Sequence, residues 1–312
     1  MTEIRTIGIV STGVIGAGWT TYFLSRGFDV VATGRSAGAE VRLRAQVAEQ
    51  WRDVERMGLA EGASQTRLRF VASLPEAIKE VDFIQENGPE RLETKRAMIA
   101  AIDEAARPDA IIASSSSGIP ISEVQSSCRH PARVLIGHPF NPPHLIPLVE
   151  VVGGNATSAE AVESAMRFYE AIGKRPIRVR KEIKGHIANR LQAALRREAY
   201  GLVAHGVATV ADIDLAISHG PGLRWSLLGP FLVQHLAGGR GGIQHHLDHL
   251  GPAMDVWWQD LYQTRLTAEL KEKIVAGVMD MLEGSDVEST AREARHALIE
   301  LLQLKERSKH LP

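Results

Sequence analysis

The sequence predicts an α/β fold, in which a doubly wound, mostly parallel sheet is followed by an all-α C-terminal domain. Short β-rich runs alternate with helical segments up to about residue 180, and this alternation is typical of βαβ units. The runs are nearly continuous in apolar residues, which suits strands covered on both faces. After residue 180 the strand signal fades, and residues 186–206 begin a helical pattern that continues to the C-terminus.

Eight strands are expected from these apolar runs. They cover residues 6–10, 28–33, 68–73, 81–86, 110–115, 133–138, 148–152 and 176–180. The length of 312 residues favours about two domains. We therefore expect a dinucleotide-binding domain over residues 1–182 and a helical substrate and dimerisation domain over residues 183–312.

Composition argues against several classes of partner. The net charge of −1 gives no electrostatic reason to expect nucleic acid or an anionic membrane. The single cysteine, Cys128, excludes an internal disulfide framework and fits a reducing compartment. The N-terminal residues show no signal-peptide pattern, and no apolar run approaches the roughly 18 residues that span a bilayer. A cytoplasmic location is the expectation.

A glycine-rich turn, STGVIGAG, follows the first expected strand and opens a helix. Gly13 lets the backbone approach a pyrophosphate, Gly16 lets the helix pack against the strand, and the helix N-terminus offers N–H groups to the phosphates. Ser11 replaces the first glycine of the usual pattern. Because the turn lies between a strand and a helix at the start of the chain, it predicts a Rossmann-like nucleotide site.

The end of the second strand, VVATGRS, bears on the choice of cofactor. An acid at position 34 would bind the ribose 2′-hydroxyl and repel a 2′-phosphate, but this chain has Gly34. Arg35 can pair with a phosphate through its planar fork, and Ser36 can donate a further hydrogen bond. The turn therefore favours NADP; the alternative is NAD, with Arg35 facing solvent.

Three segments bring polar residues to the carboxyl ends of expected strands, where open α/β sheets bind ligands. They are IIASSSSGIP, LIGHPFNPPHLIPLVEVV and KGHIANRLQ. Together with QENGPERLETKR and GPGLRWSLLGPFLVQHLAGG, they resemble the L-3-hydroxyacyl-CoA dehydrogenase superfamily. The resemblance is closest to its shorter branch, which includes L-carnitine dehydrogenase and the L-gulonate 3-dehydrogenase/λ-crystallin group, and it covers nearly the whole chain up to about residue 262.

The resemblance implies roles for individual residues. It makes His138 the catalytic base and Glu150 its orienting partner, and Ser117 and Asn189 would hold the substrate oxygen. By the same resemblance Glu90 is a nicotinamide-side and Lys95 a ribose-side cofactor contact, and Asn141 is expected at the same site. The two turns supply the other expected cofactor contacts: Ser11, Gly13, Ile15, Gly16, Gly34, Arg35 and Ser36. No metal is expected, because hydride transfer to nicotinamide needs none. The family usually has glycine at position 11 and an acid at position 34, so the chain departs from it at both.

The chemistry of alcohol oxidation asks for these groups. A base must take the hydroxyl proton, and imidazole titrates near neutrality, so it can also return the proton. A carboxylate fixes the imidazole tautomer and stabilises the imidazolium. Ser and Asn can donate hydrogen bonds to the carbonyl oxygen during reduction. The alternatives are that His138 caps a loop before Pro139 and that Glu150 is an exposed strand acid.

Two C-terminal motifs have plainer explanations. His245 and His249 lie one helical turn apart, where a solvated face or a subunit contact is a simpler interpretation than a metal site. Trp257, Trp258 and Tyr262 indicate a packed helix or a dimer interface. An aromatic wall for a quaternary ammonium substrate is the alternative for these rings.

The expected function is hydride transfer between nicotinamide and the 3-carbon of a small L-3-hydroxy acid, such as a carnitine-like substrate. Arg224 can pair with a free carboxylate, and Trp225 can line an apolar or cationic end of the substrate. The alternative is that Arg224 is structural and caps or bridges helices. An L-3-hydroxyacyl-CoA dehydrogenase is the alternative enzyme, and a λ-crystallin-like structural protein is the alternative of another class. Relatives of this kind pair through the helical domain, which implies a homodimer.

Overall fold

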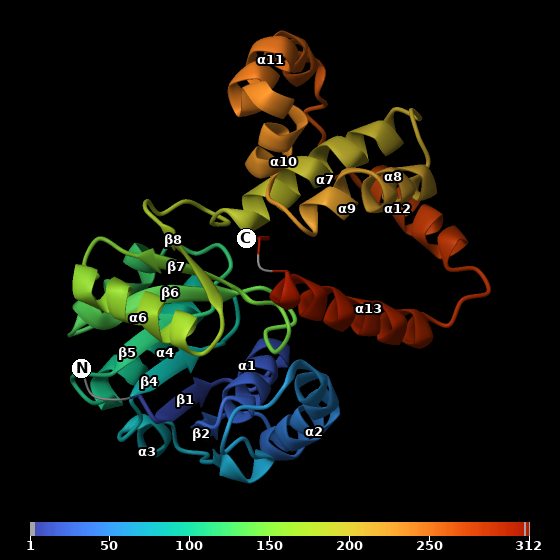
Figure 1. Ribbon diagram of the computed structural model, residues 1–312. Coiled ribbons are helices and arrows are strands. Elements are labelled where there is room, and N and C mark those ends of the chain that lie inside the picture. The colour runs from blue at the N-terminus through green and yellow to red at the C-terminus, as the bar shows by residue number, and fades with distance from the viewer. Residues whose placement is uncertain (1–3, 309, 312) are drawn as a thin grey trace. The chain divides into compact units, whose positions relative to one another are not determined.

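The computed structural model describes residues 4–308, 310 and 311. Contacts within the chain divide it into two compact units, Met1–Arg190 and Leu191–Pro312. Figure 1 colours the first unit from blue to green and the second from yellow to red. Within the described residues, no helix is both long and apolar enough to cross a membrane.

The first unit is built on one eight-stranded sheet in the order β3-β2-β1-β4-β5-β6-β7-β8. The strands are β1 (Thr6–Val10), β2 (Asp29–Thr33), β3 (Leu68–Phe70), β4 (Phe83–Glu86), β5 (Ile111–Ser114), β6 (Val134–Pro139), β7 (Leu148–Gly153) and β8 (Arg175–Val179). Neighbouring strands are parallel except for the antiparallel pair β6–β7. The predicted fold class is confirmed, and each expected strand is present with ends shifted by a few residues at most.

Helices cover both faces of this sheet. They are α1 (Val14–Ser25), α2 (Ala39–Met57), α3 (Leu74–Ile78), α4 (Leu92–Ala105), α5 (Ile121–Gln125) and α6 (Ala159–Ala171), with 3-10 turns η1 (Gln65–Arg67) and η2 (Pro131–Arg133). Helices α1, α2 and α6 pack on one face in a core rich in aromatic rings. Helices α3, α4 and α5 pack on the other face against aliphatic side chains. The apolar strands are thus buried from both sides, as their composition requires.

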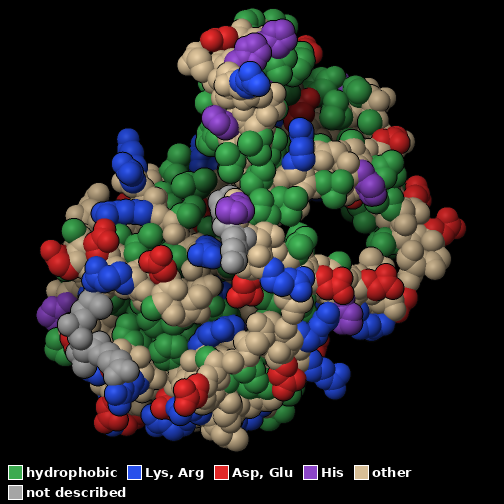
Figure 2. Space-filling view, viewed as in Figure 1, with side chains coloured by type: hydrophobic (Ala, Val, Ile, Leu, Met, Phe, Trp, Pro, Cys, Tyr) green, Lys and Arg blue, Asp and Glu red, His purple; other side chains and the backbone are tan. Residues whose placement is uncertain are grey.

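The second unit is helical throughout its described residues. It contains α8 (Val210–His219), α9 (Pro221–Trp225), α10 (Pro230–Ala237), η3 (Gly239–Gly241), α11 (Gly242–Asp260), α12 (Ala268–Met281) and α13 (Val287–Arg307). Helix α7 (Ala188–Ala204) begins at the end of the first unit and runs into the second. Figure 2 shows hydrophobic side chains on the surface of these helices, over α10 in particular. Phe231 of α10 is 75% exposed.

Candidate active site

The glycine-rich turn between β1 and α1 closes despite the missing first glycine. Ser11 adopts a left-handed backbone conformation with φ 71°, which glycine takes without cost and other residues rarely take. This is the conformation that makes glycine the usual residue at the first position of such a turn. Gly16 is also required, because a β-carbon there would lie 2.1 Å from the Ser11 carbonyl oxygen.

The start of α1 has the properties of a phosphate site. Gly13 is the N-cap, no side chain caps the helix, and its first turn carries no acid. Apart from its chain neighbours, no atom of the described residues lies within 4 Å of the place where a Gly13 β-carbon would stand, so a ligand can approach the backbone there. The N–H groups of the first turn are therefore available to an anion, as the phosphates of a dinucleotide require.

The turn after β2 is open and basic. Arg35 and Ser36 are exposed. A β-carbon on Gly34 would lie 2.8 Å from Thr12 Oγ1, so an acid at this position would force Thr12 to rotate. Arg42 of α2 also reaches this turn and donates to Ser36 Oγ at 2.6 Å. No sequence pattern singles out Arg42, because an arginine on an exposed helix face is commonplace.

His138 and Glu150 form a buried pair at the β6–β7 junction. The antiparallel register places the two residues directly opposite each other, so their side chains lie on the same face of the sheet. His138 Nδ1 lies 2.8 Å from Glu150 Oε2, and the two side chains are 6% and 0% exposed. The alternatives of a loop-capping histidine and an exposed strand acid do not fit this geometry.

Glu150 is held in its ionised form. Burial by itself raises the pKa of its carboxyl, but hydrogen bonds from His138 and from the N–H groups of Ala188 and Ile187 outweigh burial, so the pKa lies below its usual value. Those backbone N–H groups donate to Oε1 at 3.0 and 2.8 Å. Since an ionised carboxylate only accepts, His138 carries its proton on Nδ1 and leaves the Nε2 lone pair free.

Ser117 and Asn189 lie together beside the carboxyl end of β5. Asn189 Nδ2 donates to the Ser117 carbonyl oxygen at 3.3 Å. Glu90 supports the same loop, because its Oε1 accepts from the N–H groups of Ser117 and Gly118 at 2.9 Å each and from Ser116 Oγ at 2.7 Å. Glu90 therefore shapes the loop that carries Ser117, in addition to its predicted cofactor contact.

Lys95 lies deeper than a cofactor contact usually does. Its side chain is 1% exposed, and Nζ lies 3.1 Å from Oε2 of the fully buried Glu86 and 3.7 Å from Oε2 of Glu90. Glu86 in turn accepts from Ser114 Oγ at 2.6 Å. In this arrangement the Lys95 ammonium lies within ion-pair distance of two carboxylates, and its predicted contact with the ribose stays a prediction.

A second buried histidine, His186, adjoins the pair. Its ring centroid lies 5.2 Å from that of His138, and Nε2 lies 2.9 Å from the Ser116 carbonyl oxygen. Nε2 must be the donor in this bond, whereas the buried Nδ1 has no partner among the described residues. Burial lowers the pKa of His186, and the neighbouring His138 lowers it further. His186 therefore stays neutral beside His138 and fixes the Ser116–Ser117 loop.

The position of His186 could not be found from sequence patterns. Its backbone has φ 48°, directly after Gly185 with φ 77°. This left-handed pair turns the chain so that the next two N–H groups reach Glu150. A histidine in this conformation is uncommon, and no local pattern announces it.

The loop after His138 is anchored from within the first unit. Lys174 is buried, and its Nζ donates to the carbonyl oxygens of Pro143 and of Ile146, the latter at 3.0 Å. The ammonium also lies 3.6 Å from the centre of the Tyr22 ring. Burial holds the pKa of Lys174 well below its usual range. Asn141, a predicted cofactor contact, lies exposed in this anchored loop.

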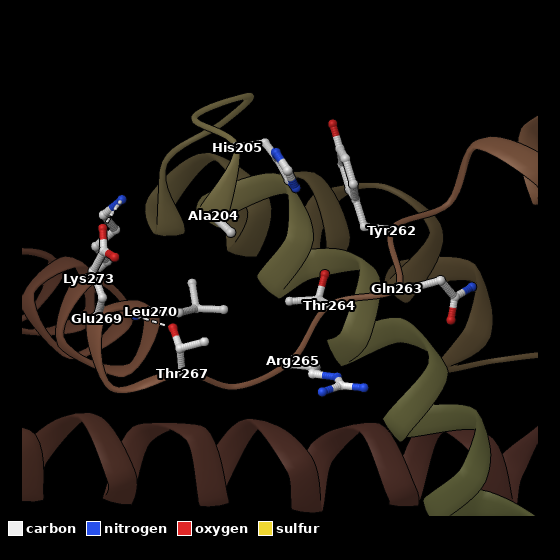
Figure 3. A pocket seen from close by; sticks show the side chains of 10 residues that line it. All are labelled: Ala204, His205, Tyr262, Gln263, Thr264, Arg265, Thr267, Glu269, Leu270 and Lys273. Atoms are coloured by element: carbon white, nitrogen blue, oxygen red, sulfur yellow. Dashed lines mark hydrogen bonds and ion pairs between the residues drawn. The ribbon is translucent and has the colours of Figure 1, made fainter.

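Arg224 and Trp225 lie on α9 of the second unit and are exposed. That unit has a pocket of about 380 Å³ of its own, which Figure 3 shows. His205 and Tyr262 stack at its rim with ring centroids 4.2 Å apart. Of the residues considered in the sequence analysis, Tyr262 from the alternative aromatic wall lines this pocket, whereas Arg224 and Trp225 do not, and their roles stay predictions.

A nucleotide-binding sheet with an uncapped helix N-terminus, joined to a buried His–Glu pair, defines the class of the protein as a nicotinamide-dependent dehydrogenase. Comparison with known families agrees. The profile of the 3-hydroxyacyl-CoA dehydrogenase NAD-binding domain matches residues 6–183, and that of the 3-hydroxyacyl-CoA dehydrogenase C-terminal domain matches residues 185–280. The chain belongs to the 3-hydroxyacyl-CoA dehydrogenase family, and it is an oxidoreductase that acts on a CH–OH group.

Individual relatives are similar over nearly their whole length. The L-carnitine dehydrogenase of Pseudomonas aeruginosa is 49% identical over 302 residues, which cover 97% of this chain and 94% of the relative. That of Streptomyces coelicolor is 47% identical over 300 residues, covering 96% and 94%. Among solved structures, an NAD⁺-dependent 5-formyl-3-hydroxy-2-methylpyridine 4-carboxylic acid 5-dehydrogenase has a TM-score of 0.86 at 28% identity, covering 98% of this chain and 99% of that one.

Proposed function

We propose that this protein oxidises and re-forms the 3-hydroxyl group of a small free L-3-hydroxy acid of the carnitine type, with NADP as the preferred nicotinamide cofactor. The observation that carries the reaction is the buried His138–Glu150 pair with His138 Nε2 free. The names of the L-carnitine dehydrogenase relatives support the substrate class.

His138 handles the proton. The lone pair of Nε2 accepts the hydrogen of the substrate hydroxyl, while Nδ1–H stays bonded to Glu150. The imidazolium that forms is stabilised by a carboxylate that two backbone N–H groups already hold in place. When bound, the nicotinamide ring takes the hydride from the same carbon or returns it.

Ser117 and Asn189 hold the reacting oxygen. One N–H of the Asn189 side-chain amide donates to the Ser117 carbonyl oxygen, and the other N–H would donate to the substrate. The Ser117 hydroxyl lies on the loop that Glu90 and His186 fix. During reduction, negative charge develops on the carbonyl oxygen, and donors fixed in advance stabilise it without reorganising.

The preference for NADP is supported by the turn after β2. An acid is missing at position 34, and Arg35 and Ser36 lie exposed beside the gap. The alternative cofactor is NAD. The 5-formyl-3-hydroxy-2-methylpyridine 4-carboxylic acid 5-dehydrogenase, whose solved structure is similar, is described as NAD⁺-dependent. The Michaelis constants of Arg35→Ala for the two cofactors distinguish these alternatives. The Michaelis constant for NADPH should rise several-fold more than that for NADH. Equal changes would remove Arg35 from phosphate binding.

The substrate is proposed to carry a free carboxylate rather than a CoA thioester. Arg224 would pair with the carboxylate, and Trp225 would contact the far end of the substrate. The test is a panel of free L-3-hydroxy acids and their CoA thioesters, each assayed with NADP and with NAD. L-carnitine should be oxidised faster than L-3-hydroxybutyryl-CoA, and Arg224→Met should raise the KM of the free acid. Turnover of the thioester alone would move the protein to the acyl-CoA branch.

The division of labour follows the two family profiles, which meet between residues 183 and 185. In this proposal residues 1–182 bind the dinucleotide, and residues 183–312 bind substrate and form a homodimer. The exposed apolar residues of the second unit, with Phe231, Trp257 and Trp258 among the most exposed, support the dimer. Light scattering at micromolar concentration should give twice the mass of the chain.

A further inference from the structure

The turn that follows β2 holds a second arginine besides Arg35. Arg42 lies in the first turns of α2, and its guanidinium folds back over the preceding loop. Nη1 donates to the Ala37 carbonyl oxygen at 2.8 Å, and Nη2 donates to Ser36 Oγ at 2.6 Å. These two bonds place the Arg42 charge at Ser36.

The charge of Arg42 is not neutralised. In the part of the chain that the structure describes, no carboxylate lies within ion-pair distance of its guanidinium. Arg44, two residues further along α2, shows the usual alternative, because it pairs with Glu40 at 2.9 Å. Glu40 is the acidic residue nearest to the turn in the sequence, and its carboxylate pairs with Arg44 rather than with Arg42. Arg42 therefore leaves positive charge beside an exposed hydroxyl.

We propose that Arg42 is a determinant of cofactor specificity, which with Arg35 and Ser36 binds the 2′-phosphate of NADP; the inference rests on the proposed preference for NADP. Ser36 Oγ accepts from Arg42, so its own hydrogen is free to donate to a phosphate oxygen. Arg42 has used one N–H at each of two nitrogens and keeps the remaining ones for the same phosphate. A phosphate bonded to Ser36 thus lies within reach of the Arg42 fork.

Two glycines make room for this arrangement. Gly38 has φ 69°, and a β-carbon there would lie 3.1 Å from Arg42 Nη1, so glycine lets the guanidinium lie against the backbone. Gly34 leaves the floor of the site free of a side chain. An acid at position 34 would press on Thr12 and Ala39, with its β-carbon 2.8 Å and 3.3 Å from their nearest atoms. It would also place a carboxylate near the two arginines, where it would compete with the phosphate.

The test is equilibrium binding of two fragments of the cofactor to the whole protein by titration calorimetry. Adenosine 2′,5′-bisphosphate carries the 2′-phosphate, and adenosine 5′-monophosphate lacks it. Wild type, Arg42→Ala, Arg42→Lys and the control Arg44→Ala are compared. Arg42→Ala should weaken the bisphosphate about tenfold or more, as loss of a charge-assisted bond predicts, and affect the monophosphate far less. Arg42→Lys keeps the charge without the fork and should fall between.

The outcomes separate the two hypotheses. A wild-type protein that binds both fragments equally tightly would overturn the NADP preference itself. A wild-type protein that prefers the bisphosphate, with the preference intact in Arg42→Ala, would keep NADP and remove Arg42 from the site. Equal loss in Arg44→Ala and Arg42→Ala would reduce the effect to general positive charge on α2 and would likewise overturn the inference.

Discussion

The two units of this protein bury their apolar residues very differently. In the first unit both faces of the sheet are covered, and rings such as Trp19, Phe23 and Phe83 are fully buried. Among the described residues of the second unit, the large hydrophobic residues that are buried are Leu270 and Ile299, which are 4% and 0% exposed. Trp257 and Trp258 of that unit are each 62% exposed. Burial of apolar surface is the main stabilising term in folding. The first unit is therefore stabilised by its own core, whereas the second unit leaves much of its apolar surface exposed to solvent.

The difference is consistent with the proposal that the first unit carries the chemistry and the second unit the assembly. In the first unit, His138 is hydrogen-bonded to Glu150, and the adjoining His186 is hydrogen-bonded to Ser116, whose hydroxyl donates to Glu90. The second unit offers apolar surface that a single chain leaves in water, in line with the proposed homodimer. Substitutions in the first unit should therefore change rates and fold stability, whereas surface substitutions in the second should change assembly.

The largest effect expected from a single isosteric change is that of Glu150→Gln. The amide removes the charge that supports the His138 imidazolium, while the N–H groups of Ile187 and Ala188 still have an oxygen to bind. We expect kcat to fall on the order of 10²-fold or more, with cofactor affinity near normal. Steady-state kinetics and cofactor titration measure both; an unchanged kcat would show that Glu150 only supports the fold.

The buried ion pair of Asp103 and Arg133 should set the stability of the first unit. Burial by itself raises the pKa of Asp103, but hydrogen bonds from the His130 N–H and from Arg133 outweigh it and lower the pKa. Asp103→Asn leaves Arg133, whose side chain is 10% exposed, without its charge partner. We expect a loss of about 3 kcal/mol in the free energy of unfolding at neutral pH, measured by urea denaturation.

The pH dependence of this loss follows from the sign of the shift. The folded-state pKa lies below the unfolded one, so the stabilisation is fully present above the ordinary carboxyl range and disappears as the pH falls through the folded pKa. The difference between wild type and Asp103→Asn should therefore narrow in acid. Glu104→Gln, the next residue on α4 with an exposed partner in Arg129, is the control and should change little. A difference independent of pH would contradict the ion-pair explanation.

Substitutions on the surface of the second unit are expected to change the catalytic rate least. Phe231 is 75% exposed, and Val41 of the first unit is 73% exposed, so they form a matched pair. Phe231→Glu should weaken the proposed dimer about tenfold or more, because a charge would be buried at the interface. Val41→Glu should leave assembly as in wild type. Sedimentation over a range of concentrations measures the dissociation constant, and dissociation in Val41→Glu instead would place the interface on the first unit.

The sequence was sufficient for the fold and for the pairing of His138 with Glu150. Apolar runs predict the strands because each is buried on both faces, and the short spacing from His138 to Glu150 fits two adjacent strands. Features that depend on tertiary geometry were not predictable. Arg42 and Arg44 are alike as sequence, and only the folded turn shows that one is paired and the other bonds to Ser36.

His186 and Lys174 show the same limit. His186 depends on two successive left-handed residues. Lys174 belongs to a basic stretch that is typical of solvent, yet it is buried beneath the loop that follows His138. The environments of His186 and Lys174 cannot be derived from residues adjacent in the sequence, because segments distant in the chain form both environments.

The role of His138 is tested most directly by the rate of L-carnitine oxidation in wild type and in His138→Ala, at saturating cofactor and with cofactor affinity measured in parallel. Loss of a general base costs on the order of 10²- to 10⁴-fold in rate. We predict a loss in this range for His138→Ala, with cofactor affinity within a factor of about two of wild type, since the nucleotide turn lies on other strands. Turnover in His138→Ala at the wild-type rate would contradict the assignment of His138 as the group that moves the proton.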